Sequence, residues 1–259
     1  MVASLLRPLG ALLGVGLLLV GLAPPAAAAP RKLPSYLHVC KRGDPQLEQC
    51  VLTSVEKIRP KLLSGIPELN VPSMEPLIIP ELVIRPSPRF QAVGKDVQVF
   101  GGSNFKVTRL RIEVNATALS FVAGVSVPHL SFVSDYQVDG QILVLPIKGR
   151  GQLTANVSDV TGSLHLLGKI VKRKGAEYLQ FVEGEFRLEL LSPVKIHLDN
   201  LFNGDKALGE ATNAALNENS EELTEVVVPV AERVVAQFAL DTANKISSAF
   251  PFDQLLPKN

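Results

Sequence analysis

The sequence has no tryptophan, only two cysteines and almost no net charge, at +1 over 259 residues. A chain this close to neutrality lacks the clustered lysine and arginine on which nucleic-acid affinity depends, so nucleic acid is not an expected partner. Its four histidines are scattered, and it contains no serine-hydrolase elbow, zinc-protease, phosphate-loop or dinucleotide-binding motif. We therefore expect a protein without catalytic residues, metal or cofactor; a triad assembled only by folding is the alternative.

The first 29 residues have the composition of a secretory signal peptide. Arg7 is the only charged residue in this stretch, and Leu9–Leu22 is an uncharged apolar run too short to cross a bilayer comfortably. Small residues then offer a cleavage site after Ala28 or Ala29. We expect residues 1–29 to be removed, which leaves a secreted, extracellular protein without a transmembrane segment. A retained anchor helix is the alternative.

Residues 30–259 show no linker or internal repeat and are interpreted as one domain. Cys40 and Cys50 are an even pair near its N-terminus, and in an oxidising compartment such a pair predicts a disulfide. A metal site is the weaker interpretation, because only His38 adds a ligand nearby. The triplets that begin at Asn115 and Asn156 have the form of N-glycosylation acceptors on the polar faces of strands, or occur by chance.

The N-terminal part of this domain predicts a helix followed by an irregular segment. Apolar residues recur at helical spacing from Leu47 to Ile66, after a candidate N-cap at Asp44. Pro60 is expected to kink this helix or end it early. The prolines of Gly65–Pro80 exclude a central strand and favour an edge or wrapping segment.

Strand patterns fill almost all of residues 90–198. Residues 106–121 form one long alternating run, and Ile142–Ile147 is apolar on both faces, as in a sheet that is covered on each side. The close spacing of the runs predicts an antiparallel meander. Lys172–Gly175 is interpreted as a solvated hairpin tip rather than an anion site.

From Asp205 the pattern becomes helical, with a short helix over residues 206–216 and a long one from Ser220 to Phe250 that contains Pro229. A helix this long and this apolar needs a partner surface on more than one side, and a curved sheet wrapped around it supplies one. The fold class is therefore predicted to be α+β.

Several segments together resemble the insect takeout and juvenile-hormone-binding protein family. They are the cysteine pair before a helix, "GIPELNVPSMEPL", "GGSNFKVTRLRI", "DGQILVLPIKGRGQL", "LDNLFNGDKALGEATNAALNEN" and "PFDQLLP", in the family's order. The hormone-binding members typically carry a second disulfide, for which this chain has no cysteines, so it resembles the takeout branch more. The resemblance implies the tubular lipid-binding (TULIP-like) fold, in which a highly curved antiparallel sheet wraps a long C-terminal helix and encloses an apolar tunnel.

The expected function is that of a secreted, non-enzymatic carrier for a small lipophilic ligand, and the resemblance suggests juvenile hormone, another terpenoid or a fatty-acyl molecule. A monomer is expected. The candidate cavity residues are inward-facing apolar side chains of strands and helix, for which ordinary core packing is the alternative: Leu110, Ile112, Phe186, Leu188, Val230, Val234 and Phe238. The alternative function is an extracellular interaction protein that docks to a receptor of unknown identity or to a lipid surface.

Overall fold

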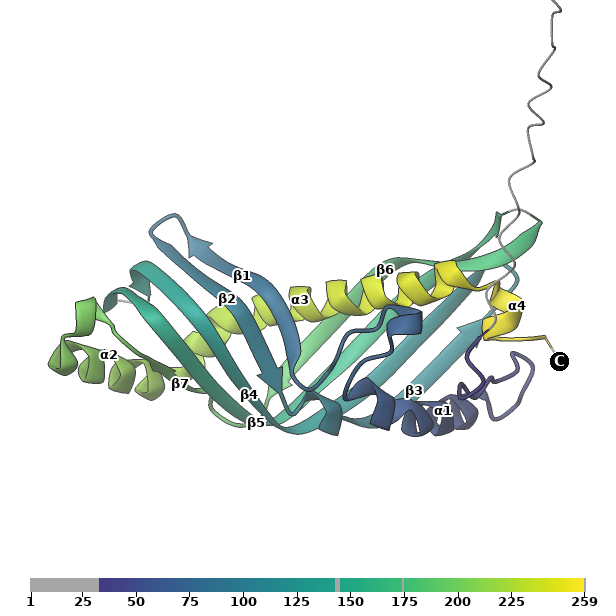
Figure 1. The fold of residues 1–259 in the computed structure, drawn as a ribbon, viewed down its shortest axis with the longest axis horizontal. Helices are drawn as coiled ribbons and strands as arrows, with labels where there is room; N and C mark the ends of the chain where they lie inside the picture. The colour runs from purple at the N-terminus through teal and green to yellow at the C-terminus, as the bar shows by residue number, and fades with distance from the viewer. Residues whose placement is uncertain (1–32, 143–144, 174, 259) are drawn as a thin grey trace, which may run out of the picture. The chain divides into compact units, whose positions relative to one another are not determined.

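One seven-stranded antiparallel sheet carries the long helix α3 along it (Figure 1). The structure is a computed structural model that describes residues 33–142, 145–173 and 175–258, all within one unit, Arg31–Asn259. The expected signal peptide, residues 1–29, lies outside the described residues.

The sheet is organised by two long central strands. Its strands are β1 (Leu77–Ser87), β2 (Phe90–Phe100), β3 (Lys106–Val114), β4 (Ala118–Ile142), β5 (Leu145–Arg173), β6 (Ala176–Leu190) and β7 (Lys195–Leu198). The order is β1-β2-β4-β5-β6, with β3 also paired to β4 and β7 to β5. Strands β4 and β5 pair from Ala118↔Lys169 to Ile142↔Leu145, and each is long enough to hold two shorter partners one after the other on its other edge. The predicted antiparallel arrangement is confirmed.

Two strand predictions are corrected. Residues 106–121 are not one strand, because the side-chain oxygen of Asn115 accepts the backbone N–H groups of Thr117 and Ala118 and turns the chain between β3 and β4. Ile142–Ile147 is not one strand apolar on both faces, because β4 ends at Ile142 and β5 begins at Leu145. The expected hairpin tip lies between β5 and β6, where Gly175 has a positive φ of 81°.

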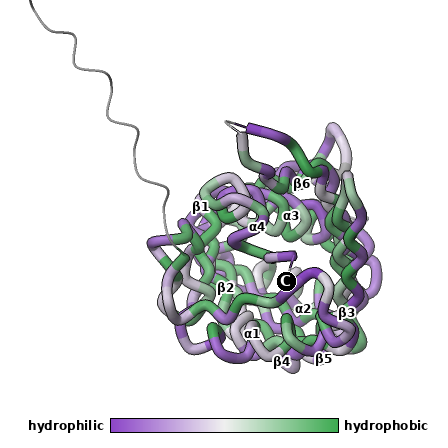
Figure 2. Tube along the Cα trace, turned by 90° about the vertical axis from the view of Figure 1, so that its right-hand side faces the viewer, coloured by the Kyte–Doolittle hydropathy of each residue, from purple (hydrophilic) through white to green (hydrophobic). Residues whose placement is uncertain are grey.

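The proline-rich segment leads into an edge strand, as the sequence predicted. β1 includes Pro80 and pairs on one side only, with β2, so the missing N–H interrupts no central ladder. β1 and β6 are the two ends of the strand order, and the described strands do not close into a barrel. Figure 2 shows the sheet curled so that α3 lies between β1 and β6.

The α-helices are α1 (Leu47–Leu62), α2 (Lys206–Glu218), α3 (Ser220–Ala249) and α4 (Phe252–Leu255), and short 3-10 turns occupy Pro67–Leu69, Gly102–Asn104 and Phe202–Gly204. The predicted N-cap is corrected: α1 begins at Leu47, and its N-cap is Gln46, which makes no side-chain capping bond. Asp44 lies in the turn before the helix, where its carboxylate accepts the Gln46 N–H at 2.8 Å. The helix ends two residues after Pro60, before Ile66. Pro229 lies inside α3, which spans about 45 Å at 1.5 Å per residue.

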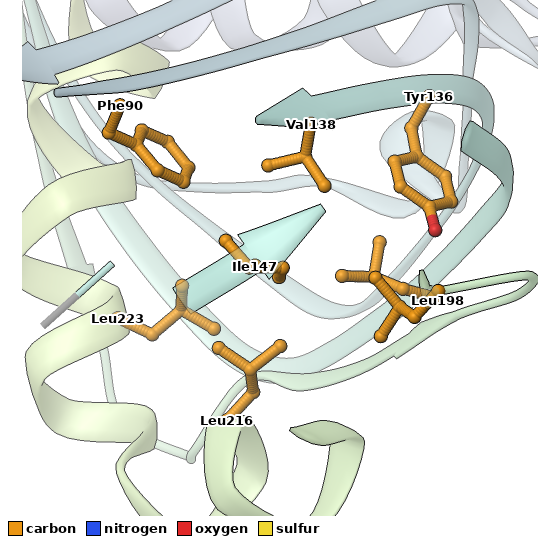
Figure 3. Close-up of a cluster of buried hydrophobic side chains, with 8 residues drawn as sticks. Phe90, Tyr136, Val138, Ile147, Leu198, Leu216 and Leu223 are labelled. Carbon is orange, nitrogen blue, oxygen red and sulfur yellow. The ribbon is translucent and has the colours of Figure 1, made fainter. Parts of the chain in front are cut away.

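The buried apolar clusters lie near the two ends of α3, and further buried residues of the sheet, among them Ala123, Val160 and Leu166, lie outside these clusters. Leu223 at the start of α3 packs in a cluster with α2, β2, β4, β5 and the end of β7 (Figure 3), whose members are Phe90, Tyr136, Val138, Ile147, Leu198, Leu201, Leu216 and Leu223. Near its other end, Phe250 packs with Ile66 and Leu69, and Phe252 of α4 packs in a further cluster with the disulfide, α1 and strands β4 and β6. The central stretch of α3 belongs to none of these clusters.

Candidate functional site

The middle of α3 is incompletely covered. Every residue of α3 between Leu223 and Ser247 is described, and none of them is buried. A helix packed tightly against a sheet buries one continuous stripe, and here the apolar stripe is only half-buried. This stretch of the interior is therefore the candidate site.

All seven predicted cavity residues are half-buried. Leu110 and Ile112 lie on β3, Phe186 and Leu188 on β6, and Val230, Val234 and Phe238 on α3. On the strands their neighbours in sequence are charged and exposed, so the predicted choice of faces agrees with the structure. Their role in holding a ligand stays a prediction.

The strand register places two of the predicted strand residues, Leu110 and Phe186, on one row of the sheet. Leu110 pairs with Ala123 of β4, which pairs with Leu164 of β5, which pairs with Phe186 of β6. Side chains directly opposite one another in a ladder share a face, so this row crosses four strands on one face. The sequence pattern alone did not single out Leu164, because only pairing shows which residues lie beside Phe186.

Two glycines of this face allow close approaches. A Cβ on Gly162 would lie 2.4 Å from the Phe186 ring, so the ring occupies the space that a side chain would fill. A Cβ on Gly184 would lie 3.3 Å from Leu240 of α3, where the helix comes against β6. Larger residues at these positions would push the ring or the helix outward.

Polar side chains of α3 hold the helix on the free edge of β6. The Glu232 carboxylate accepts the Leu188 N–H at 2.9 Å and lies 3.5 Å from an Arg187 guanidinium nitrogen. The Asn244 amide accepts the Phe181 N–H and donates to the Phe181 carbonyl, both at 2.9 Å. These bonds satisfy backbone groups that an edge strand otherwise leaves unpaired.

The α4 end is held by the disulfide and by an arginine. Cys40 and Cys50 form the expected disulfide, which joins the N-terminal arm to α1. Arg42 donates to the Leu256 carbonyl at 2.7 Å, pairs with Asp253 and stacks 4.1 Å from the Phe252 ring centroid. The arm is therefore tied to α1 on one side and to the C-terminal segment on the other.

At the opposite end, Tyr136 connects the sheet to the turn after β7. Its hydroxyl donates to the Asp199 carbonyl at 2.5 Å, and its side chain is 6% exposed. Burial, with a smaller contribution from Asp199, raises the pKa of Tyr136 to about 12.

Neither a metal site nor a membrane span is indicated in the part of the chain that the structure describes. His38, Cys40 and Cys50 bring ligand atoms within 4.8 Å of one another, but the disulfide consumes both sulfurs. Across residues 33–142, 145–173 and 175–258, no helix has the length and hydropathy to cross a bilayer.

The two sequons have different settings, and neither is tested for occupancy. Asn115 is exposed, as predicted. It lies in the turn between β3 and β4, however, and not on a strand as expected. Asn156 is exposed on β5, where its side chain accepts a hydrogen bond from Ser131 at 2.7 Å.

A concavity of about 660 Å³ is formed by residues of β2, β4 and β5 and by Asn200 after β7. Charged and amide side chains line it together with Val93 and Tyr136, and none of the seven predicted cavity residues takes part. It is therefore a different space from the predicted apolar site.

Comparison with known proteins places the chain in a family. The family model described as haemolymph juvenile hormone binding protein (JHBP) matches residues 16–257. The chain is a member of the JHBP family. The sequence-based resemblance to takeout and juvenile-hormone-binding proteins is thereby confirmed.

Relatives of this JHBP-family chain match over most of its length. The circadian clock-controlled protein daywake of Drosophila melanogaster is 26% identical over 87% of this chain and 88% of its own length. A putative beta-carotene-binding protein of Schistocerca gregaria is 21% identical over 83% of this chain and 86% of its own length. The crystal structure of Takeout 1 from Epiphyas postvittana superposes with a TM-score of 0.72 at 18% identity, over 85% of this chain and 99% of that one, which shows the shared fold.

Proposed function

We propose that this JHBP-family protein is a secreted, non-enzymatic carrier of a small lipophilic ligand. The observation that carries the proposal is the half-buried apolar stretch between the two buried ends of α3. In the proposed complex the ligand fills the space between α3 and the row that contains Leu164 and Phe186. Family membership and the name of the putative beta-carotene-binding relative support a lipophilic cargo.

Apolar burial is sufficient to hold such a ligand. Each square ångström of apolar surface removed from water contributes about 25 cal/mol, so a ligand that buries roughly 300 Å² gains about 7 kcal/mol before the entropic cost of binding. No reacting group is required for this. A terpenoid or fatty-acyl chain, juvenile hormone included, fits the apolar side chains of the site.

The first experiment is native mass spectrometry of the protein secreted by insect cells, with organic extraction of what co-purifies. A stoichiometric lipophile, and an N-terminus after Ala28 or Ala29, are the expected results. An empty protein that also takes up neither terpenoids nor fatty acids would overturn the carrier function and favour an extracellular interaction protein. The same spectra report whether the protein is a monomer, as expected.

A further inference from the structure

The two acceptor triplets of the chain differ in the partners of their polar atoms. The Asn115 side-chain oxygen accepts the Thr117 N–H at 2.9 Å, the Thr117 hydroxyl at 3.1 Å and the Ala118 N–H at 2.8 Å. Asn115, Ala116 and Thr117 are all exposed. The triplet at Asn115 is therefore a compact surface turn in which the threonine hydroxyl is bonded to the asparagine amide group.

The polar atoms of the other triplet bond the neighbouring strand instead. Asn156 accepts the Ser131 hydroxyl at 2.7 Å. The Ser158 hydroxyl lies 3.0 Å from Nδ1 of His129, and both of these partners belong to β4. Residues two apart on a strand are separated by about 7 Å, so Asn156 and Ser158 do not form the compact turn of the first triplet.

The turn at Asn115 forms without help from the rest of the sheet. Its bonds join residues no more than three positions apart, as in other turns that an asparagine side chain closes on nearby backbone. The bonds of Asn156 and Ser158 join residues 25 and 29 positions apart and require β4 and β5 to be paired. Because local closure is faster than such pairing, the chain presents the first triplet as a turn before the sheet assembles.

An N-glycosylation acceptor is defined by a hydroxyl two residues after the asparagine. In the Asn115 turn this hydroxyl already contacts the amide group, and in the strand that contains Asn156 it bonds another residue. We propose that Asn115 carries an N-linked glycan and that Asn156 carries none. This inference rests on the secretion that is part of the proposed function, and it separates two sites that the sequence alone treats alike.

The modification leaves the turn intact. The bonds of the turn all end on the oxygen of the Asn115 side chain, and the sugar is added to its nitrogen. This nitrogen forms a bond to C1 of the first sugar of a lipid-pyrophosphate-linked oligosaccharide. The bond between C1 and the pyrophosphate oxygen breaks, the lipid pyrophosphate leaves, and the amide loses one proton, so nothing is oxidised or reduced. An exposed turn accommodates the bulky, solvated product without loss of packing.

The test maps glycans by glycopeptide mass spectrometry on the full chain secreted by insect cells. Four forms are compared: wild type, Asn115→Asp, Asn156→Asp and Ser158→Thr. Aspartate keeps the side-chain oxygen that the turn needs and lacks the nitrogen that takes the sugar. We expect a single glycan, at Asn115, in every form except Asn115→Asp, which loses it. Ser158→Thr is the matched control, because it gives both triplets the same hydroxyl residue.

The outcomes separate this inference from the carrier function. A secreted wild type that is bare at Asn115 or glycosylated at Asn156 would overturn the inference and leave the carrier function standing. A glycan that appears at Asn156 in Ser158→Thr would overturn it too, because the kind of hydroxyl and not the turn would then decide occupancy. If the wild type stays inside the cells with residues 1–29 attached, secretion itself is wrong and the inference fails with it.

Discussion

At the residue scale, side chains packed near the start of α3 and side chains in its middle are under different constraints. Tyr136 is fully packed and bonded, whereas Phe238 is half-buried and has only apolar surface to offer. Substitutions at these two positions therefore test different properties, stability at the first and capacity for a ligand at the second.

Replacing Phe238 with tryptophan tests whether the middle of α3 borders empty space. Where a core is full, added volume costs about 1–3 kcal/mol, and where a cavity is present the larger ring enters it. We expect Phe238→Trp to reduce uptake of a fluorescent fatty acid by about tenfold or more with an unchanged melting temperature. Val235→Trp, at a 37% exposed position of the same helix, is the control and keeps full uptake. A lower melting temperature with intact uptake would show that Phe238 is ordinary core.

Replacing Tyr136 with phenylalanine tests the raised pKa of this tyrosine, which lies in the cluster near the start of α3. Because the folded protein raises this pKa from 10.0 to about 12, the residue's contribution to stability is complete below pH 10 and is lost as the pH rises toward 12. Two pKa units correspond to about 3 kcal/mol of unfolding free energy. We expect wild type, but not Tyr136→Phe, to show this loss in urea unfolding between pH 10 and 12. Tyr178→Phe retains Tyr136 and serves as the control; identical profiles for all three proteins would contradict the prediction.

At the element scale, asparagine amides attach helices to strand backbones. Asn213 and Asn217 lie one turn apart on α2 and bond both backbone groups of Leu198 and Ile196, which are two residues apart on β7. The rise of one helical turn roughly matches the advance of two strand residues, so the same bond pattern repeats. Asn244 makes the same pair of bonds from α3 to β6.

The buried member of this series is the more sensitive one. Asn213→Ala removes two hydrogen bonds and leaves the Leu198 N–H and carbonyl unpaired inside the protein, and we expect a loss of about 2–3 kcal/mol in urea unfolding. Glu210→Ala, on the exposed side of the same helix, controls for helix propensity and is expected to change stability by less than about 0.5 kcal/mol. Equal effects of the two substitutions would show that the amide bonds do not hold α2 on the sheet.

At the scale of the described unit, the Cys40–Cys50 disulfide and Arg42 tie the N-terminal arm to α1 and to the C-terminal segment. The disulfide closes a loop of 10 residues between the arm and α1, and Arg42 on the same arm holds the segment around α4. The closure at this end of α3 thus depends on contacts between residues more than 200 positions apart.

Removing the disulfide is expected to weaken this closure. Cys40→Ser with Cys50→Ser restores the entropy of the open loop to the unfolded chain, which lowers the unfolding free energy by roughly 2–3 kcal/mol. Ligand dissociation is expected to accelerate, since the arm that holds α4 is freed. Lys41→Ser, at an exposed position between Cys40 and Arg42, is the control in calorimetry and in the dissociation assay. A double variant with wild-type stability would show that packing alone fixes the arm.

Local patterns in the sequence determined the identity and face of most elements. Alternation in β3 and β6, the edge position of the proline segment and the extent of α3 all follow from the spacing of apolar residues and from backbone chemistry that acts within a few residues. The disulfide followed from the number and position of the cysteines. These properties are short-range, so no partner segment was needed to predict them.

Only the tertiary structure decided where strands end and what lies beside what. The turn at Asn115 and the hairpin after Ile142 interrupt runs that look continuous, because apolar residues on both sides of a turn keep the same alternation. The row from Leu110 to Phe186 depends on register across four strands. The half-buried middle of α3 depends on what fails to pack against it, and the sequence around a residue does not contain that information.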